Sequence, residues 1–165
     1  FAVMGPGVEA GSQSDEPVIS YDLLPTVADI AGATDALPDE LDGRSIRHVL
    51  KNPKSKIQRP PEGLVFHFPH YNVCGLNEPH SAIRIGDYKL LKFTSSNREL
   101  LFNVADDPGE SEDLFEANIA LAGKLNAELE TYLDAVDAEK PEESNSWKNG
   151  RSGATKTLFL SRYPK

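Results

Sequence analysis

The residues best suited to chemistry gather in one short stretch, His67-Phe68-Pro69-His70-Tyr71-Asn72-Val73-Cys74, with His80 shortly after it. Imidazole nitrogens and a phenol at a strand end can donate hydrogen bonds to hydroxyl or anionic oxygens, which is typical of substrate recognition. Two other interpretations stay open. The histidines and the thiol are ligands that zinc takes, although their spacing matches no known zinc pattern. Alternatively, the histidines cap loop carbonyls beneath a packed tyrosine.

Two further groups have side chains that chemistry can use. Cys74 is the only cysteine, and a lone cysteine is more often a small buried hydrophobe than an activated nucleophile. Asp106-Asp107-Pro108-Gly109-Glu110 places three carboxylates in one turn. Calcium ligation usually spreads oxygens over a longer loop, whereas an Asx-type turn explains these residues without a metal. Neither group by itself predicts a catalytic or metal site.

The histidine stretch lies among segments that alternate like strands. The pattern predicts strands over 64–68, 81–85, 88–93 and 99–103, with Gly86-Asp87 as a two-residue hairpin connection. A long amphipathic helix is predicted from about Ile119 to Asp137. A sheet with one apolar face and a helix with one apolar stripe bury each other. The sequence therefore predicts an α+β fold, a four-stranded antiparallel sheet packed by one long C-terminal helix.

The first part of the chain has a different pattern. Residues 1–4 are an apolar run that predicts a buried strand, and a helix follows over 20–32. The apolar face of that helix is expected to pack on the strand; it comprises Leu23, Leu24, Val27, Ile30 and Ala31. We accordingly divide the chain into four segments. They are a strand-helix segment (1–35), a connector (36–62), a sheet-helix segment (63–139) and a basic, mostly irregular tail (140–165).

Composition excludes several classes of protein. The 165 residues are 39% hydrophobic and 26% charged, which is typical of a globular protein. The net charge of −9 argues against nucleic acid as the main partner, because phosphate neutralisation needs a basic face. No window approaches the roughly 18 apolar residues of a membrane span, so no membrane partner is expected.

Several short motifs occur together in one order. Val3-Met4-Gly5-Pro6-Gly7 resembles a late strand and loop of the catalytic domain of type I sulfatases. Other segments resemble further motifs of that family; they are Asp22-Leu23-Leu24-Pro25-Thr26 with Ala31-Gly32, Leu41-Asp42-Gly43-Arg44-Ser45-Ile46, His67-Phe68-Pro69-His70-Tyr71, Arg84-Ile85-Gly86-Asp87-Tyr88-Lys89-Leu90, and Glu99-Leu100-Leu101-Phe102-Asn103 through Asp113-Leu114. Each motif alone is weak, but six in order resemble the C-terminal portion of an arylsulfatase-like enzyme of the alkaline phosphatase superfamily.

The resemblance implies that residues 1–35 are the last strand and helix of a larger α/β catalytic domain and that 63–139 are the family's C-terminal subdomain. It also implies hydrolysis of sulfate esters by the full-length enzyme. It implies a formylglycine made from C/S-x-P-S/A-R and a Ca²⁺ or Mg²⁺ ion, and an address in the periplasm or outside the cell. Cys74 is followed by Gly-Leu-Asn-Glu, so that motif does not match here. No catalytic residue and no metal ligand is therefore carried over, and the chain alone is expected to be inactive. The implied partners are the missing N-terminal catalytic portion and a sulfated small molecule or glycan.

What the resemblance implies for this chain is substrate contact, since the family's small subdomain leans over the mouth of the active site. We expect His67 and His70 to bind substrate, with Tyr71 and Asn72 behind them. Two alternatives stay open. One is a non-catalytic interaction module, in which the basic tail and the acidic sheet hold a partner chain. The other is part of a related hydrolase of phosphate or phosphonate esters.

Overall fold

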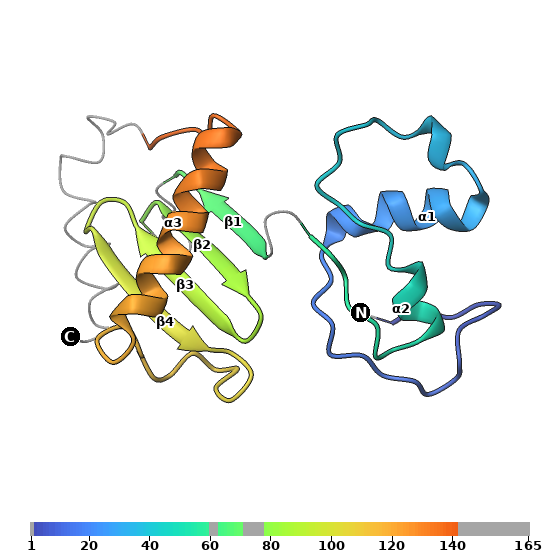
Figure 1. Ribbon diagram of the computed structural model, residues 1–165, viewed down its shortest axis with the longest axis horizontal. Helices are drawn as coiled ribbons and strands as arrows, with labels where there is room; N and C mark the ends of the chain where they lie inside the picture. Colours follow the sequence, from blue (N-terminus) through green and yellow to red (C-terminus); the bar gives the residue numbers. More distant parts are fainter. Residues whose placement is uncertain (1, 60–62, 71–77, 142–165) are drawn as a thin grey trace. The chain divides into compact units, whose positions relative to one another are not determined.

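The computed structural model describes residues 2–59, 63–70 and 78–141. The chain divides into two compact units, Phe1–Glu62 and Gly63–Lys165, and each is described by itself. Figure 1 shows the second unit as a sheet crossed by one long helix, and the first unit as short helices joined by loops. In the described part of the chain, no helix is long and apolar enough to cross a membrane.

The second unit is built on a four-stranded antiparallel sheet. Its strands are β1 (Leu64–Phe68), β2 (His80–Ile85), β3 (Tyr88–Phe93) and β4 (Arg98–Asn103), and they pair in chain order. The tight connection from β2 to β3 needs a left-handed residue, which Gly86 supplies with a φ of 59°. Helix α3 (Ile119–Ala135) follows the sheet. The predicted α+β architecture is confirmed.

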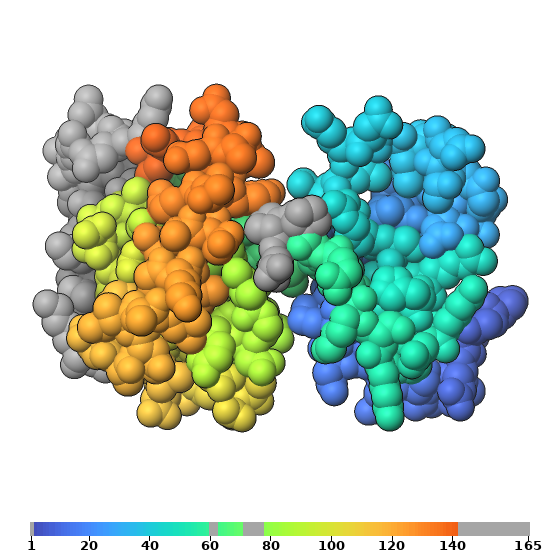
Figure 2. Space-filling view, viewed as in Figure 1, coloured from blue at the N-terminus to red at the C-terminus, as the bar shows by residue number. Residues whose placement is uncertain are grey.

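The sheet has two apolar faces, because successive side chains of a strand point to opposite sides. Helix α3 covers one face, on which buried residues of three strands meet the helix; they are Ile83, Leu90 and Leu101 with Ala122, Leu125 and Leu129. Figure 2 shows α3 as a continuous orange band over the yellow-green strands. The opposite face has its own cluster of buried residues, namely Ala82, Leu91, Phe93, Leu100 and Phe102.

A lysine ties three elements together on the α3 face. Lys92 of β3 donates to Glu130 Oε1 at 2.6 Å and to Asn126 Oδ1 at 3.0 Å, both on α3. The same ammonium lies 3.8 Å from Glu99 Oε1 on β4. Since these contacts are specific in position, Lys92 fixes where α3 lies along the sheet.

The described residues of the first unit, 2–59, form four short helices. They are η1 (Ser20–Asp22), α1 (Leu23–Ala31), η2 (Thr34–Ala36) and α2 (Arg47–Lys51). Residues 2–4, the described part of the strand expected over 1–4, have no regular structure. A strand needs a neighbour for its backbone hydrogen bonds, and no strand occurs among the described residues of this unit. The expectation that α1 packs on this strand is therefore not met.

Helix α1 is oriented opposite to the expectation. Three polar residues hold the segment 43–47, namely Asp22, which precedes α1, and Thr26 and Asp29 of α1. Asp22 Oδ1 accepts from the Arg44 amide, Thr26 Oγ1 from the Ile46 amide, and Asp29 Oδ2 from the Ser45 hydroxyl. The expected inward face is turned out instead, and Leu24, Val27 and Ile30 are 57–63% exposed. Within this unit the polar contacts, not the apolar ones, decide which face of α1 is packed.

The connector predicted over 36–62 takes part in this packing. Ile46, Val49 and Ile57 are buried and form a small apolar cluster, against which Val18 and Leu50 pack. Helix α2 presents Val49 to this cluster. The described residues of the connector are thus more than a surface loop, because their few apolar side chains are spaced to meet each other.

Candidate functional site

The predicted histidines lie at one end of the sheet. Strand β1 ends at Phe68, β2 begins at His80 and β3 ends at Phe93, and these three residues stand opposite one another in register. His67 is the penultimate residue of β1 and is opposite Ser81. The end of the sheet therefore brings His67, His70 and His80 into one neighbourhood.

His67 is bound by the protein through both ring nitrogens. Its Nε2 lies 2.8 Å from the carbonyl oxygen of Glu139, beyond the end of α3, and its Nδ1 lies 2.8 Å from Ser81 Oγ. A carbonyl oxygen only accepts, so Nε2 carries the hydrogen, and in the neutral ring Nδ1 accepts from the Ser81 hydroxyl. We call Ser81, His67 and Glu139 the clasp, because they tie the chain after α3 to β1 and β2.

The other two histidines are associated with aromatic rings. His80 lies between Phe68, at 5.6 Å between ring centroids, and Phe93, at 5.7 Å. His70 meets the Phe68 ring edge-on at 5.8 Å. By strand alternation Phe68, His80 and Phe93 are on the face opposite α3, whereas His67 and Ser81 are on the α3 face. The structure therefore separates His67 from the ring group that includes His70.

Two predicted residues, Tyr71 and Asn72, lie outside the described residues, as does Cys74. The ring group adds Phe68 and Phe93, which the sequence does not mark for binding, to His80, which the sequence places with the other histidines. Their signal is present in the sequence as alternation within strands. Reading it requires the pairing register, since only the register shows that Phe68, His80 and Phe93 are adjacent.

The clasp predicts a local effect on stability. His67→Ala removes the donor to the Glu139 carbonyl oxygen, and Ser81→Ala removes the partner that orients the His67 ring. Either substitution should lower the local stability of the backbone around Glu139 by about 1 kcal/mol, which makes amide hydrogen exchange there roughly fivefold faster. Amide hydrogen exchange of residues 138–140 measures this. His67→Gln is the matched control, because its amide nitrogen can still donate near the position of Nε2. Unchanged exchange in the alanine variants would show that the clasp does not hold this segment.

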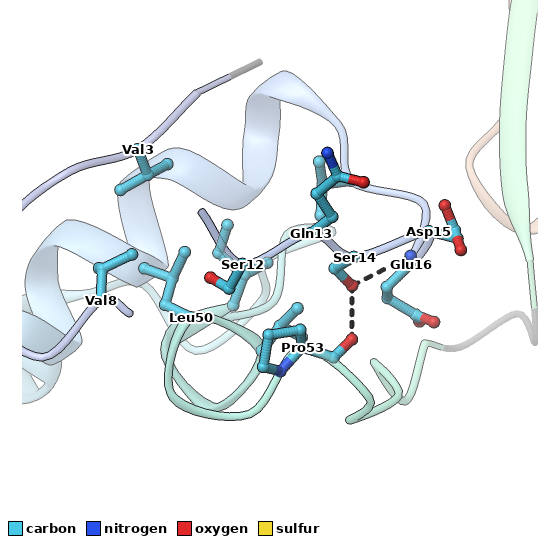
Figure 3. A pocket seen from close by; sticks show the side chains of 12 residues that line it. Val3, Val8, Ser12, Gln13, Ser14, Asp15, Glu16, Leu50 and Pro53 are labelled. Atoms are coloured by element: carbon cyan, nitrogen blue, oxygen red, sulfur yellow. Dashed lines mark hydrogen bonds between the residues drawn. The ribbon is translucent and has the colours of Figure 1, made fainter. Parts of the chain in front are cut away.

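A cavity of about 380 Å³ lies in the first unit (Figure 3). Val18, Ile46, Val49 and Leu50 form its apolar lining, and the loop 12–16 supplies its polar side. The Ser14 hydroxyl closes part of the rim by donating to the Pro53 carbonyl oxygen at 2.7 Å. Its charged side chains are Asp15 and Glu16, which would repel an anion. The cavity therefore offers no site for a sulfate group.

The turn after β4 is explained by its own hydrogen bonds. The carboxylate of Asp107 accepts from the backbone amides of Ser111 at 2.6 Å and Glu112 at 2.9 Å. The bond from Glu112, followed by those from Ser111, lowers the pKa of this carboxyl. Over 2–59, 63–70 and 78–141, no group of three His, Cys, Asp or Glu side chains is placed to hold a metal ion. The metal that the resemblance implies is not fitted by these residues.

Known proteins resemble this chain over most of its length. A family model described as N-sulphoglucosamine sulphohydrolase, C-terminal, matches residues 2–139. Arylsulfatase K of Mus musculus is 33% identical over 115 residues, which are 66% of this chain and 20% of that protein. Delta 4,5-hexuronate-2-O-sulfatase of Bacteroides thetaiotaomicron is 30% identical over 137 residues, 81% of this chain and 27% of that protein. The chain thus spans about a fifth to a quarter of these relatives.

Solved structures have a similar fold. One is a protein in complex with its substrate D-glucosamine-2-N,6-O-disulfate; at 25% identity and a TM-score of 0.65, the match covers 84% of this chain and 28% of that one. Another is a 2-O GAG sulfatase, with 25% identity, a TM-score of 0.62, and coverage of 88% of this chain and 32% of that one. Each match spans less than a third of the solved chain.

Proposed function

Since the chain belongs to the family of sulfatase C-terminal domains, we propose that it is the C-terminal portion of an enzyme that hydrolyses sulfate esters of sugars. The observation that carries this proposal is the family match over residues 2–139, which runs through both units. The sulfated sugar as substrate class is supported by the relatives and neighbours whose names include a sulfated glucosamine or a hexuronate sulfate.

The first role that we propose for the chain is to complete the fold of the large domain. Leu24, Val27 and Ile30 lie three residues apart on one side of α1 and are 57–63% exposed. A contiguous apolar stripe on a helix usually marks a contact surface. The polar side of α1 is already occupied by segment 43–47. The stripe is therefore free to receive the catalytic part of the same enzyme.

The second role is to help shape the substrate pocket from the histidine end of the sheet. Both ring nitrogens of His67 are taken by the clasp, so a substrate contact there would first have to displace Ser81 or Glu139. His70 is exposed and has no such bond among the described residues. We therefore propose His70 as the substrate-contacting member of the predicted pair. The nucleophile and the metal ligands belong to the remainder of the enzyme.

Kinetics of the full polypeptide that contains this chain test the proposal. We expect it to release sulfate from at least one of a panel of sulfated monosaccharides that includes N- and 6-O-sulfated glucosamine and 2-O-sulfated hexuronate. His70→Ala should raise KM about 3–10-fold, the effect of roughly one lost hydrogen bond. His48→Ala is the control, because His48 is also an exposed histidine but belongs to the first unit.

The possible results separate the two parts of the proposal. Release of sulfate from none of the panel would contradict the sulfatase function. Release with unchanged kinetics in His70→Ala would keep the sulfatase function and remove the contact by His70. A melting temperature equal to that of the wild type is required for either conclusion, because a folding defect also lowers activity.

A further inference from the structure

We propose that the rings of Phe68 and His80 form a platform that binds an uncharged sugar ring next to the sulfated one. This inference rests on the proposed function and adds a subsite for a second sugar, so that the preferred substrate is an oligosaccharide. The platform is defined here as Phe68, His80, the supporting Phe93 and the flanking His70.

The rings of the platform form a row across the end of the sheet. Three adjacent strands each contribute one ring in register, at centroid separations of 5.6 Å and 5.7 Å and with interplanar angles of 35° and 46°. Phe93 is buried and supports the row, whereas Phe68 and His80 are half-buried and His70 is exposed. Tilted rings at these distances are a favourable aromatic arrangement. A sugar ring presents an apolar C–H face, which fits such a surface.

The hydrogen-bonding state of His80 selects the kind of sugar. Its Nδ1 lies 2.8 Å from the carbonyl oxygen of Glu78, which can only accept, so Nδ1 carries the hydrogen. In the neutral ring Nε2 is then an acceptor, and it has no hydrogen bond to any residue in the described part of the chain. A sulfate ester has no hydrogen to donate, whereas a sugar hydroxyl has one. The platform therefore matches a sugar hydroxyl, and not a sulfate group, at His80 Nε2, as an unsulfated ring would supply.

The opposite face of the same strand end supports this division of roles. His67 is one residue from Phe68 but on the α3 face, where the clasp holds it. It keeps the end of β1 beside β2, and the rings of Phe68 and His80 stand directly opposite each other on those two strands. His67 is thus a positioning residue for the platform.

The test compares two substrates of the intact enzyme. One is a sulfated monosaccharide that the enzyme hydrolyses, and the other is a disaccharide in which the same ring is joined to an unsulfated sugar. His80→Phe keeps a ring but removes the acceptor, and Phe68→Leu keeps an apolar side chain but removes the ring. We expect the disaccharide-to-monosaccharide ratio of kcat/KM to fall about tenfold in the first variant and about fivefold in the second.

Phe66→Leu is the matched control, because Phe66 is on the same strand and face and is 47% exposed, but has none of the ring contacts of the platform. An unchanged ratio in both platform variants overturns the inference. So does a lowered melting temperature with an unchanged ratio, which would show that the rings pack against protein. If His80→Phe does not fold, the same ratio measured for His80→Gln and Phe68→Leu decides. A wild type that hydrolyses no sulfated sugar contradicts the proposed function itself.

Discussion

Replacing Asp22 by alanine is expected to destabilise the first unit by about 3–5 kcal/mol, because it leaves a buried cation without its partner. Asp22 is fully buried, and the Arg59 side chain is only 8% exposed. The Asp22 carboxylate accepts from both terminal nitrogens of Arg59 and from the backbone amides of Ile19 and Arg44. Urea unfolding, followed by amide exchange in residues 2–59, measures the loss.

Asp29→Ala is the control for this substitution. Asp29 lies in α1, which follows Asp22 directly, and also pairs with an arginine, Arg47, but both side chains are about a third or more exposed. Exposed pairs contribute little, so we expect only a small fraction of the loss seen for Asp22. Equal losses in the two variants would show that burial of the Asp22–Arg59 pair is not what makes it important.

Acid should destabilise the first unit for the same reason as the Asp22 substitution, because protonation removes the charge of the Asp22 carboxylate. Burial acts to raise the pKa of Asp22, but hydrogen bonds from Arg59, Arg44 and Ile19 outweigh burial and hold this pKa below its usual value. A carboxyl with a lowered folded-state pKa stabilises the fold above its unfolded pKa, about 3.9, and this contribution is lost as the pH falls through the folded value. The melting temperature should therefore fall less steeply between neutral and acidic pH in Asp22→Asn than in the wild type.

Replacing Gly43 by alanine should cost the first unit roughly 2–4 kcal/mol, since over-packing alone typically costs about 1–3 kcal/mol. A Cβ at Gly43 would lie 2.1 Å from the carbonyl oxygen of Tyr21 and 2.7 Å from its carbonyl carbon. These atoms belong to the backbone of η1, so segment 43–47 would have to move away from η1. The shift would strain the bonds that Asp22 and Thr26 make to that segment. Thermal unfolding measures the loss.

Gly123→Ala is the opposite case and serves as the control. Gly123 is an exposed position within α3, and a Cβ there would meet nothing within 4 Å. Alanine favours a helix over glycine by about 1 kcal/mol, so the second unit should become slightly more stable. If Gly43→Ala were tolerated as well as Gly123→Ala, the close approach between Gly43 and Tyr21 would not be required for folding.

Much of the second unit could be predicted from local patterns. The strand and helix bounds follow from alternation and helical spacing, and the Gly86-Asp87 pair indicates the hairpin. The first unit was predicted less well, because an amphipathic pattern identifies an apolar face but not its partner. In α1 the contacts of Asp22, Thr26 and Asp29 turn that face outward. These are long-range bonds to residues 44–46, and no local pattern indicates them.

The position of the histidine stretch at a strand end could be predicted, but not the contacts of its side chains. The histidine stretch does lie at the end of the sheet, where several strands meet. His67 and His70 do not lie on one face of the sheet as a pair. His67 and Phe68 are neighbours on β1 and point to opposite faces of the sheet, and His70 contacts the Phe68 ring. The partners of His67 could not be predicted, since Glu139 is 72 positions away in the chain. Tyr71 and Asn72 remain predictions.

The polar contacts that hold segment 43–47 have a consequence for assembly. They keep α1 helical without any contribution from its apolar stripe, so the helix is already ordered before a partner covers Leu24, Val27 and Ile30. A preorganised surface avoids the ordering cost that a disordered segment incurs on binding. Association through this stripe should therefore be limited by encounter and not by helix formation, and it should proceed with little change in helix content.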